Sequence, residues 1–519
     1  MKKIFIFFLL ATFQISAQDD FNKWIKSEKE KFEKFLSEDE KNFYEFLKKE
    51  WKSFELQPSI PSVKNPKPIK IPEVNKPLDK VLPDKKLEPK PELKNPDIEK
   101  ITPQNPEHKP TVTEQPKLQL PESANTNNKN IEAKEVLDVP SPIPYKNEIS
   151  IENGASSEID YYDGNVHIIY PALFKISSSG EINNQTIAEV FKNLSTASTN
   201  EFISKLKNYK NQKKLNDWGY FELVNRIAKN INEEKQNESF LLSWFLLLKS
   251  GYKVKIGLIN KEVFLFVKCK ETIYDVPYIT DKNGEKTYLI NFGERKSVNG
   301  QLFTYDGDYS NSKLYLSLQI NEVPNLDQNF VNKPFQLQFN HKFYSINISL
   351  NKNIINYYKD YPATEYETYF NAKVSNEIQN SLLNELQKII QKMKEDEAIN
   401  FLLRFVQTCF EYKTDEENFG KEKALFVEET LFYPASDCED RAILFSYLVK
   451  NLLALKVIGI DYPNHIATAV YTKNVYSGDK VSFKGEEYII CDPTYINANA
   501  GMSMPNHGIN TIENIIEIE

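Results

Sequence analysis

The chain has 519 residues and a formal net charge of −8, from 65 basic and 73 acidic side chains. This acidic balance excludes nucleic acid as the main partner, because phosphate binding needs a concentrated basic surface. Four cysteines exclude a disulfide scaffold. At about 150 residues per domain, the length predicts about three domains if the whole chain folds.

Residues 1–17 predict a signal peptide. Lys2 and Lys3 precede a short apolar run, and small residues follow up to Ala17, after which we expect cleavage. The apolar run is too short to span a membrane comfortably, and no cysteine stands where a lipid anchor would be attached. The mature protein is therefore expected to be secreted across the inner membrane, into the periplasm or the extracellular space.

Residues 18–56 predict one amphipathic helix. Apolar side chains recur every 11 residues, which is three helical turns of about 3.67 residues each, so they stay on one face. One aromatic series consists of Phe21, Phe32, Phe43 and Phe54. We expect this face to dock on a protein partner, on its own copy or on the folded domains. A lipid surface is less favoured, because the polar face carries as many acids as bases.

Residues 57–145 predict a Pro-rich spacer, disordered or extended. Eighteen of the 27 prolines lie between Pro58 and Pro144, and the first glycine of the chain is Gly154. Proline without glycine favours extended, semi-rigid chain. A plain spacer is favoured over a ligand for modules that bind proline-rich peptides.

Three segments near the C-terminus carry the candidate chemistry. Residues 434–449 predict a helix with Cys438 in its first turn, where unpaired backbone N–H groups favour a thiolate. Two later segments read as strands that carry His465 and Asp492. His465 can take the thiol proton and Asp492 can orient the imidazole through its other nitrogen. The N–H of Cys438 would donate to the oxyanion, and Tyr433 is the candidate for the second donor.

Three acidic residues surround this cysteine: Asp437, Glu439 and Asp440. Their charge opposes the effect of the helix dipole on the thiol. We expect them to face solvent, to bind a cationic substrate group or to pair with Arg441.

The order of cysteine at a helix start, histidine on a strand and Asp-Pro on the next strand resembles the transglutaminase-like superfamily, which has a papain-like fold. The string SDCEDRA resembles the Gly-Asp-Cys-Glu-Asp-Tyr-Ala motif of the bacterial transglutaminase-like cysteine peptidases, with Ser436 in place of Gly and Arg441 in place of Tyr. The resemblance covers about residues 385–500. It implies an α+β fold with a helix packed on an antiparallel sheet. It also implies acyl transfer, in which Cys438 attacks an amide and forms a thioester. No cofactor or metal is implied.

Residues 146–285 predict a degenerate copy of this domain. QNESFLLSWFLLLK aligns without gaps to DCEDRAILFSYLVK at an offset of 201 residues (438 − 237). The residues at or near the triad positions are Asn237, then Lys261, Glu262 and Val263, then Asp275. Residues 286–350 predict a β-rich connector, and residues 351–519 the catalytic domain.

The other cysteines and the C-terminal tail carry further groups that could take part in chemistry. Cys491, next to Asp492, is expected to point to the opposite face of its strand and to be structural. Cys269 and Cys409 could pair in an oxidising compartment. The tail NAGMSMPNHG offers Met502, Met504 and His507, for which a substrate-side loop is favoured over a soft-metal site.

These features predict a cysteine hydrolase for an amide or isopeptide bond in a peptide, protein or cell-wall peptide. A cross-linking transglutaminase is the alternative enzyme, because either water or an amine can resolve a thioester. A non-catalytic binding or assembly scaffold is the alternative from another class of protein.

Overall fold

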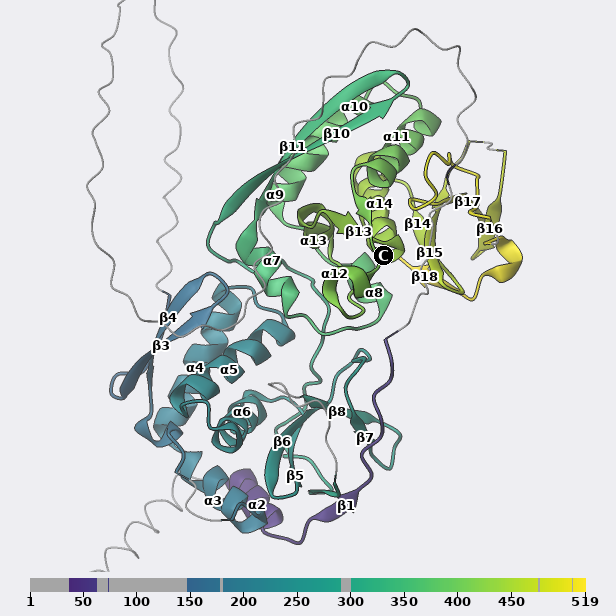
Figure 1. Ribbon diagram of the computed structural model, residues 1–519. Helices are drawn as coiled ribbons and strands as arrows, with labels where there is room; N and C mark the ends of the chain where they lie inside the picture. Colours follow the sequence, from purple (N-terminus) through teal and green to yellow (C-terminus); the bar gives the residue numbers. More distant parts are fainter. Residues whose placement is uncertain are drawn as a thin grey trace, which may run out of the picture. The chain divides into compact units, whose positions relative to one another are not determined.

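The computed structural model describes residues 37–62, 73, 147–177, 181–290, 300–474, 477–505 and 507–519. These residues form a mixed α+β protein with two larger antiparallel sheets and helices packed on them (Figure 1). Within this part of the chain, no helix is both long and apolar enough to cross a membrane. The predicted α+β class is confirmed.

The first sheet has six antiparallel strands. Their order in the sheet is β1 (Lys52–Phe54), β9 (Leu302–Thr304), β5 (Val254–Ile259), β6 (Glu262–Val267), β8 (Lys286–Ile290) and β7 (Tyr278–Thr280). Helix α6 (Gln236–Ser250) packs on β5 and β6. It is apolar on nearly all sides and is therefore almost wholly buried. It ends at Gly251, whose φ of 104° is a conformation that glycine adopts without steric cost.

Three helices surround α6, and each begins after a polar capping residue. They are α3 (Asn184–Leu194), α4 (Ala197–Gln212) and α5 (Asp217–Ile231). Asn183, Thr196 and Asn216 accept backbone N–H groups at these three helix starts. A small sheet contacts α4 and α5, and its strands are β2 (Glu148–Ser150), β4 (Gly164–Tyr170) and β3 (Ala155–Tyr161).

The second sheet has five antiparallel strands. Their order is β16 (Lys480–Phe483), β17 (Glu486–Cys491), β15 (His465–Tyr471), β14 (Val457–Tyr462) and β18 (Asn514–Glu517). Helix α14 (Cys438–Leu453) packs on β14 and β15, and α11 (Glu395–Thr408) and α13 (Val427–Phe432) pack on α14. The C-terminal part therefore has the predicted helix on an antiparallel sheet.

The remaining elements connect these layers. A long hairpin consists of β10 (Phe330–Phe339) and β11 (Lys342–Asn351), visible in Figure 1 above α7 (Lys352–Lys359). The other helices are α8 (Tyr366–Phe370), α9 (Asn376–Ile378), the π-helical η2 (Gln379–Leu383), α10 (Asn384–Ile390), α12 (Asp415–Phe419) and the 3₁₀ turns η1 (Ala172–Phe174) and η3 (Ile509–Thr511). A short parallel pair joins β12 (Glu411–Tyr412) to β13 (Ala435–Ser436).

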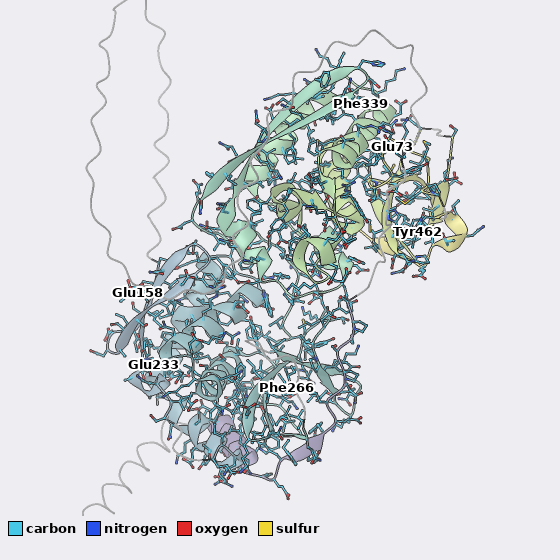
Figure 2. All side chains as sticks on the ribbon, in the orientation of Figure 1. Glu73, Glu158, Glu233, Phe266, Phe339 and Tyr462 are labelled. Carbon is cyan, nitrogen blue, oxygen red and sulfur yellow. The ribbon has the colours of Figure 1, made fainter. Side chains whose placement is uncertain are left out.

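The two larger sheets share a strand order. The order β9-β5-β6-β8-β7 in the first sheet matches β18-β14-β15-β17-β16 in the second. The central hairpins also share a register: Ile259 pairs with Glu262, as Tyr462 (labelled in Figure 2) pairs with His465. The residue that opens β15 is thus 203 positions after the one that opens β6, since 465 − 262 = 203.

The prediction of one helix over residues 18–56 is wrong in its second half. Helix α2 (Glu38–Leu47) ends well before residue 56, and the chain then forms β1 beside β9. Burial explains the break, because Phe43 and Trp51 both pack on Tyr305, with ring centroids 5.9 and 5.6 Å apart. This apolar face therefore docks on the chain's own folded core. The first half of the predicted helix and the signal peptide lie outside the described residues.

Two predicted boundaries look different in three dimensions. The boundary at residue 285 falls inside the β7–β8 hairpin, so β8 and β9 complete the first sheet rather than form a connector. The described start of the predicted spacer lies against the same sheet. Gln57 pairs with Tyr278, and the N–H of Ser62 donates to the Asp275 carboxylate at 3.0 Å.

Candidate active site

Cys438 is the first residue of α14, as predicted. Asp437 is the N-cap in extended backbone, and its N–H donates to the Asp440 carboxylate at 3.3 Å. The Cys438 side chain is fully buried, at 0% exposure. The nucleophile candidate therefore lies at a helix N-terminus but inside the protein.

His465 and Asp492 meet at the ends of neighbouring strands. The Nε2 atom of His465 lies 2.8 Å from Oδ2 of Asp492, and both side chains are buried. Oδ1 of Asp492 accepts the backbone N–H groups of Thr494 and Tyr495 at 2.9 and 3.1 Å. Burial raises the pKa of Asp492, but His465 and these N–H groups outweigh it, so the pKa lies below its usual range.

These contacts define the tautomer of the imidazole. A carboxylate accepts hydrogen bonds, so Nε2 of His465 carries a proton, and in the neutral imidazole Nδ1 keeps a lone pair. Nδ1 is buried and makes no hydrogen bond to any residue that the structure describes. His465 is therefore held as a proton acceptor by the group predicted to orient it.

The Cys438 thiol is not directed at that lone pair. It donates to Oε2 of Glu439 at 3.1 Å. Because α14 packs on β15, the helix start and the strand start belong to one core. The structure thus joins His465 to Asp492 by a hydrogen bond, whereas proton transfer from Cys438 requires the thiol to leave Glu439.

The acidic residues around Cys438 do not face solvent, so the first of the three alternatives given for them is wrong. Asp437, Glu439 and Asp440 are all buried. Oδ1 of Asp440 accepts the N–H of Leu425 at 2.8 Å, which ties the helix start to the preceding loop.

Arg441 is also buried, and it donates hydrogen bonds to two uncharged groups. Its Nε donates to Ser436 Oγ at 3.2 Å and Nη2 donates to the Phe410 carbonyl at 3.0 Å. Burial lowers the pKa of Arg441 to about 10, although the charges of Asp437 and Asp440 act to raise it. Arg441 therefore offsets part of the acidic charge while it positions the chain before the helix.

Two groups of carboxylates beside the cysteine could hold a cation. Oxygens of Asp415, Asp437 and Asp440 lie within 4.8 Å of one another, as do those of Asp415, Glu422 and Glu439. Carboxylate oxygens are the ligands that hard divalent cations prefer. Sequence reasoning missed Asp415, the first residue of α12, and Glu422, which follows that helix, because both precede Cys438 by 16 or more residues.

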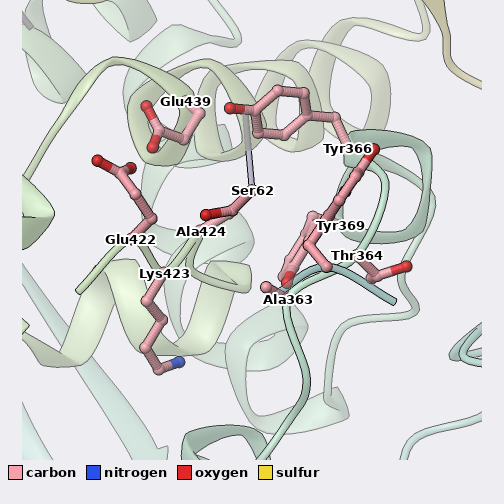
Figure 3. A pocket seen from close by; sticks show the side chains of 10 residues that line it. Ser62, Ala363, Thr364, Tyr366, Tyr369, Glu422, Lys423, Ala424 and Glu439 are labelled. Atoms are coloured by element: carbon pink, nitrogen blue, oxygen red, sulfur yellow. The ribbon is translucent and has the colours of Figure 1, made fainter. Parts of the chain in front are cut away.

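Glu439 also lines a small cavity of about 30 Å³, and Figure 3 shows its carboxylate on the same side as that of Glu422. Tyr366, Tyr369 and Ser62 complete much of the wall. The volume has room for about one or two water-sized groups. The Glu439 carboxylate, which accepts a hydrogen bond from the Cys438 thiol, therefore also borders a cavity with room for a small polar group.

Tyr433, the predicted second oxyanion donor, lies in the chain segment just before Cys438. Its ring packs on Phe419 and Phe432, and burial raises its pKa. Its carbonyl accepts from Nζ of Lys333 at 2.9 Å, as does the carbonyl of Phe432 at 3.0 Å. Lys333 thus holds the chain that leads to Cys438, and burial lowers the pKa of this amine to about 8.

Two further residues lie near the site: Gln407, which was not predicted, and His507, which was expected in a substrate-side loop. Nε2 of Gln407 donates to the carbonyls of Asp492 and Ala498, at 3.0 and 3.1 Å, from a buried position on α11. A glutamine on the apolar face of a predicted helix was the available signal. His507, which the sequence placed in a tail loop, packs against His465 with ring centroids 5.0 Å apart.

The first sheet holds different residues at the matching places. Asn237 lies in the first turn of α6 and accepts the N–H of Val263 at 2.9 Å, and Glu262 opens β6. The match of Asp275 to Asp492 is wrong. Asp275 precedes β7, whereas Ile290 pairs with β6 as Cys491 pairs with β15, so the counterpart of Asp492 follows Ile290 outside the described residues.

All four cysteines of the chain are free thiols in this structure. Cys269 and Cys409 therefore do not form the disulfide considered for them. Cys491 is fully buried in the core.

Comparisons with protein-family models, with curated proteins and with solved structures found no match to this chain.

Proposed function

We propose that the chain is an exported cysteine-dependent acyl-transfer enzyme that hydrolyses a peptide or isopeptide amide bond. The observation that carries this proposal is the state of His465. Its Nε2 is bonded to Asp492 at 2.8 Å, while its buried Nδ1 has no hydrogen-bond partner among the described residues. An imidazole held in this way is suited to accept a proton from a nucleophile.

In the proposed reaction, all proton transfers pass through Nδ1 of His465. Nδ1 takes the thiol proton, the sulfur of Cys438 adds to the amide carbonyl carbon, and the N–H of Cys438 donates to the oxyanion. The C–N bond then breaks, and the imidazolium gives its proton to the leaving amine. Water, deprotonated by Nδ1, adds to the thioester, and the C–S bond breaks to release the acid and restore the thiol.

We propose further that the C-terminal part belongs to the transglutaminase-like superfamily and that the first sheet with α6 is a degenerate copy of it. The shared strand order and hairpin register support this. Asn237 and Glu262 lie at the positions of the nucleophile and the base, so this copy lacks the cysteine and the histidine that the proposed reaction needs. An experimental structure in which α6, β5 and β6 failed to superpose on α14, β14 and β15 would reject the duplication.

A non-catalytic scaffold is the second candidate, and one observation favours it. The Cys438 side chain has 0% exposure and its thiol donates to Glu439, so the site is closed to substrate as it stands. If the chain is a scaffold, the Cys438 thiol should be alkylated slowly, at a rate that does not depend on His465. A cross-linking enzyme would differ from the hydrolase only in using an amine to resolve the thioester.

Alkylation with iodoacetamide, mapped by mass spectrometry, separates these candidates. Cys491 is an internal control. It lies on β17, beside the strand that carries His465, it is as buried as Cys438, and burial raises the pKa of its thiol. We expect Cys438 to react much faster than Cys491 and to lose that advantage in His465→Ala. Equal and unchanged rates at the two cysteines would reject the enzyme.

Hydrolysis of candidate peptides provides the direct test. We expect Cys438→Ala to abolish hydrolysis while the circular dichroism spectrum stays that of the wild type. Hydrolysis that persists in Cys438→Ala would reject the mechanism. Export is tested separately by N-terminal sequencing of the mature protein, which we expect to begin at Gln18.

A further inference from the structure

His507 lies beside the candidate base although it is 42 residues further along the chain (507 − 465 = 42). The two imidazole rings have centroids 5.0 Å apart and an interplanar angle of 61°. Tyr462 touches both rings, stacked on His465 at 6.2 Å and edge-on to His507 at 5.5 Å. The ring of His465 is thus bounded by two aromatic neighbours as well as by Asp492.

The loop that carries His507 is anchored to the sheet. The N–H of Gly501 donates to the Ile490 carbonyl at 2.7 Å, and the N–H of Asp479 donates to the Gly501 carbonyl at 3.0 Å. The N–H of His507 donates to the carbonyl of Met504, which is itself buried. These backbone bonds tether the loop to the sheet, and the ring of His507 forms one wall beside His465.

Backbone carbonyls are the polar neighbours of His507. Nδ1 lies 3.2 Å from the Pro505 carbonyl, and the Pro463 carbonyl is a second acceptor for the ring. No hydrogen bond joins the two imidazoles within the described part of the chain, so His507 acts on His465 only through ring packing and charge.

We propose that His507 is a positioning residue of the active site, which keeps the His465 ring in its working orientation and couples its protonation to a second imidazole. This inference rests on the proposed function. The charged and titratable groups around His507 are His465 on β15, Tyr462 on β14 and Asp492 after β17, with the Pro505 and Pro463 carbonyls beside it.

The charge coupling has a definite sign. Burial and the neighbouring His465 lower the pKa of His507, while the Pro505 and Pro463 carbonyls and Asp492 act in the opposite direction. His507 is therefore neutral when His465 is protonated as the ion-pair partner of the thiolate. By linkage, a proton on either imidazole disfavours a proton on the other.

The first test needs no activity. We expect His465→Gln to raise the pKa of His507 by about half a pH unit, the size of a like-charge interaction at 5.0 Å in a water-like dielectric. NMR of the labelled imidazoles measures this, since the chain has only five histidines and single variants assign them. An unchanged His507 titration would overturn the inference, whether or not the chain is an enzyme.

The second test separates ring packing from charge, using the pH profile of iodoacetamide alkylation at Cys438. His507→Phe keeps an aromatic ring without a titrating group, and because His507 is neutral while His465 is protonated, we expect the profile to stay that of the wild type. His507→Ala removes the ring that packs on His465, and we expect alkylation of Cys438 to slow about tenfold or more.

His341→Gln, in the exposed β10–β11 turn, is the control and should leave the profile unchanged. A profile that is the same in His507→Phe, His507→Ala and wild type would overturn the positioning role. If instead His465→Ala alkylates Cys438 as the wild type does, the proposed function fails. The NMR result would still decide the coupling of the two imidazoles.

Discussion

Asp492→Asn tests the triad most sharply, because this carboxylate uses both of its oxygens. Oδ2 accepts from His465 at 2.8 Å, and Oδ1 accepts from Thr494 and Tyr495 at 2.9 and 3.1 Å. An asparagine has one acceptor oxygen and one NH₂ group, so it cannot serve all three donors. One of two defects must follow.

If the amide oxygen faces the two backbone N–H groups, the NH₂ group faces His465. Nε2 must then present its lone pair, the proton moves to Nδ1, and the base is blocked. This arrangement costs about 1–2 kcal/mol of folding free energy and lowers activity by about 10³- to 10⁴-fold. If the amide is flipped, two buried donors lose their acceptor at about 1–3 kcal/mol each. The first arrangement is cheaper, so we expect a folded but inactive variant.

Three measurements check this prediction. Urea unfolding at pH 7 gives the loss of stability, and alkylation of Cys438 and peptide hydrolysis give the loss of function. The pKa of Asp492 is lowered in the folded state, so its stabilisation is present above the usual carboxyl range and is lost as pH falls through the folded value. The stability difference between variant and wild type should therefore shrink in acid.

Asp479→Asn is the matched control, because Asp479 is an exposed carboxylate that accepts one backbone N–H, from Ser503 at 3.2 Å. We expect almost no effect from it. An Asp492→Asn protein that alkylates Cys438 at the wild-type rate would refute the assigned tautomer of His465.

Three further substitutions test the packing and the buried charges by urea unfolding. The Phe43 side chain is 5% exposed, so Phe43→Ala should cost about 3–5 kcal/mol of stability. Phe343 is 80% exposed, so the control Phe343→Ala should cost less than about 0.5 kcal/mol. Equal losses would contradict the docking of α2 on the core. Lys423→Met leaves the buried carboxylate of Glu429, 2.6 Å from Nζ, without its cationic partner, which should cost about 3–5 kcal/mol of stability. Because burial raises the pKa of Glu429, this loss should be smaller at pH 5 than at pH 8. A loss that does not depend on pH would contradict this. Burial raises the pKa of Glu428 to about 7, so its contribution to stability is present below pH 4.5 and is lost as pH rises through 7. Glu428→Gln should therefore be more stable than wild type by about 3 kcal/mol at pH 8 and equally stable at pH 4. Equal stability at both pH values would contradict the shift.

Local features of the C-terminal region could be predicted from the sequence. Pro434, Ser436 and Asp437 punctuate the chain before a helix, and α14 begins at Cys438 as expected. Alternating apolar residues predicted the strands that carry His465 and precede Asp492. Capping and alternation act over a few residues, so the sequence alone contains them.

The N-terminal repeat shows where this reasoning ends. Its 11-residue period predicts a helix through residue 56, but α2 ends at Leu47 and β1 follows. Residues 302–304 offer β1 a sheet edge, and Tyr305 offers Phe43 and Trp51 a surface. Neither is near in sequence, and tertiary contacts outweigh the small differences in helix propensity.

By itself, the sequence determined the order and type of the chemical groups: a cysteine at a helix start, a histidine opening a strand and an aspartate closing the next. Only the tertiary structure decided which nitrogen of His465 meets Asp492, that the Cys438 thiol donates to Glu439, and that His507 packs on the base. The reason is physical. Backbone patterns depend on neighbours in the chain, whereas the partner of a buried polar atom depends on which distant segments exclude water around it.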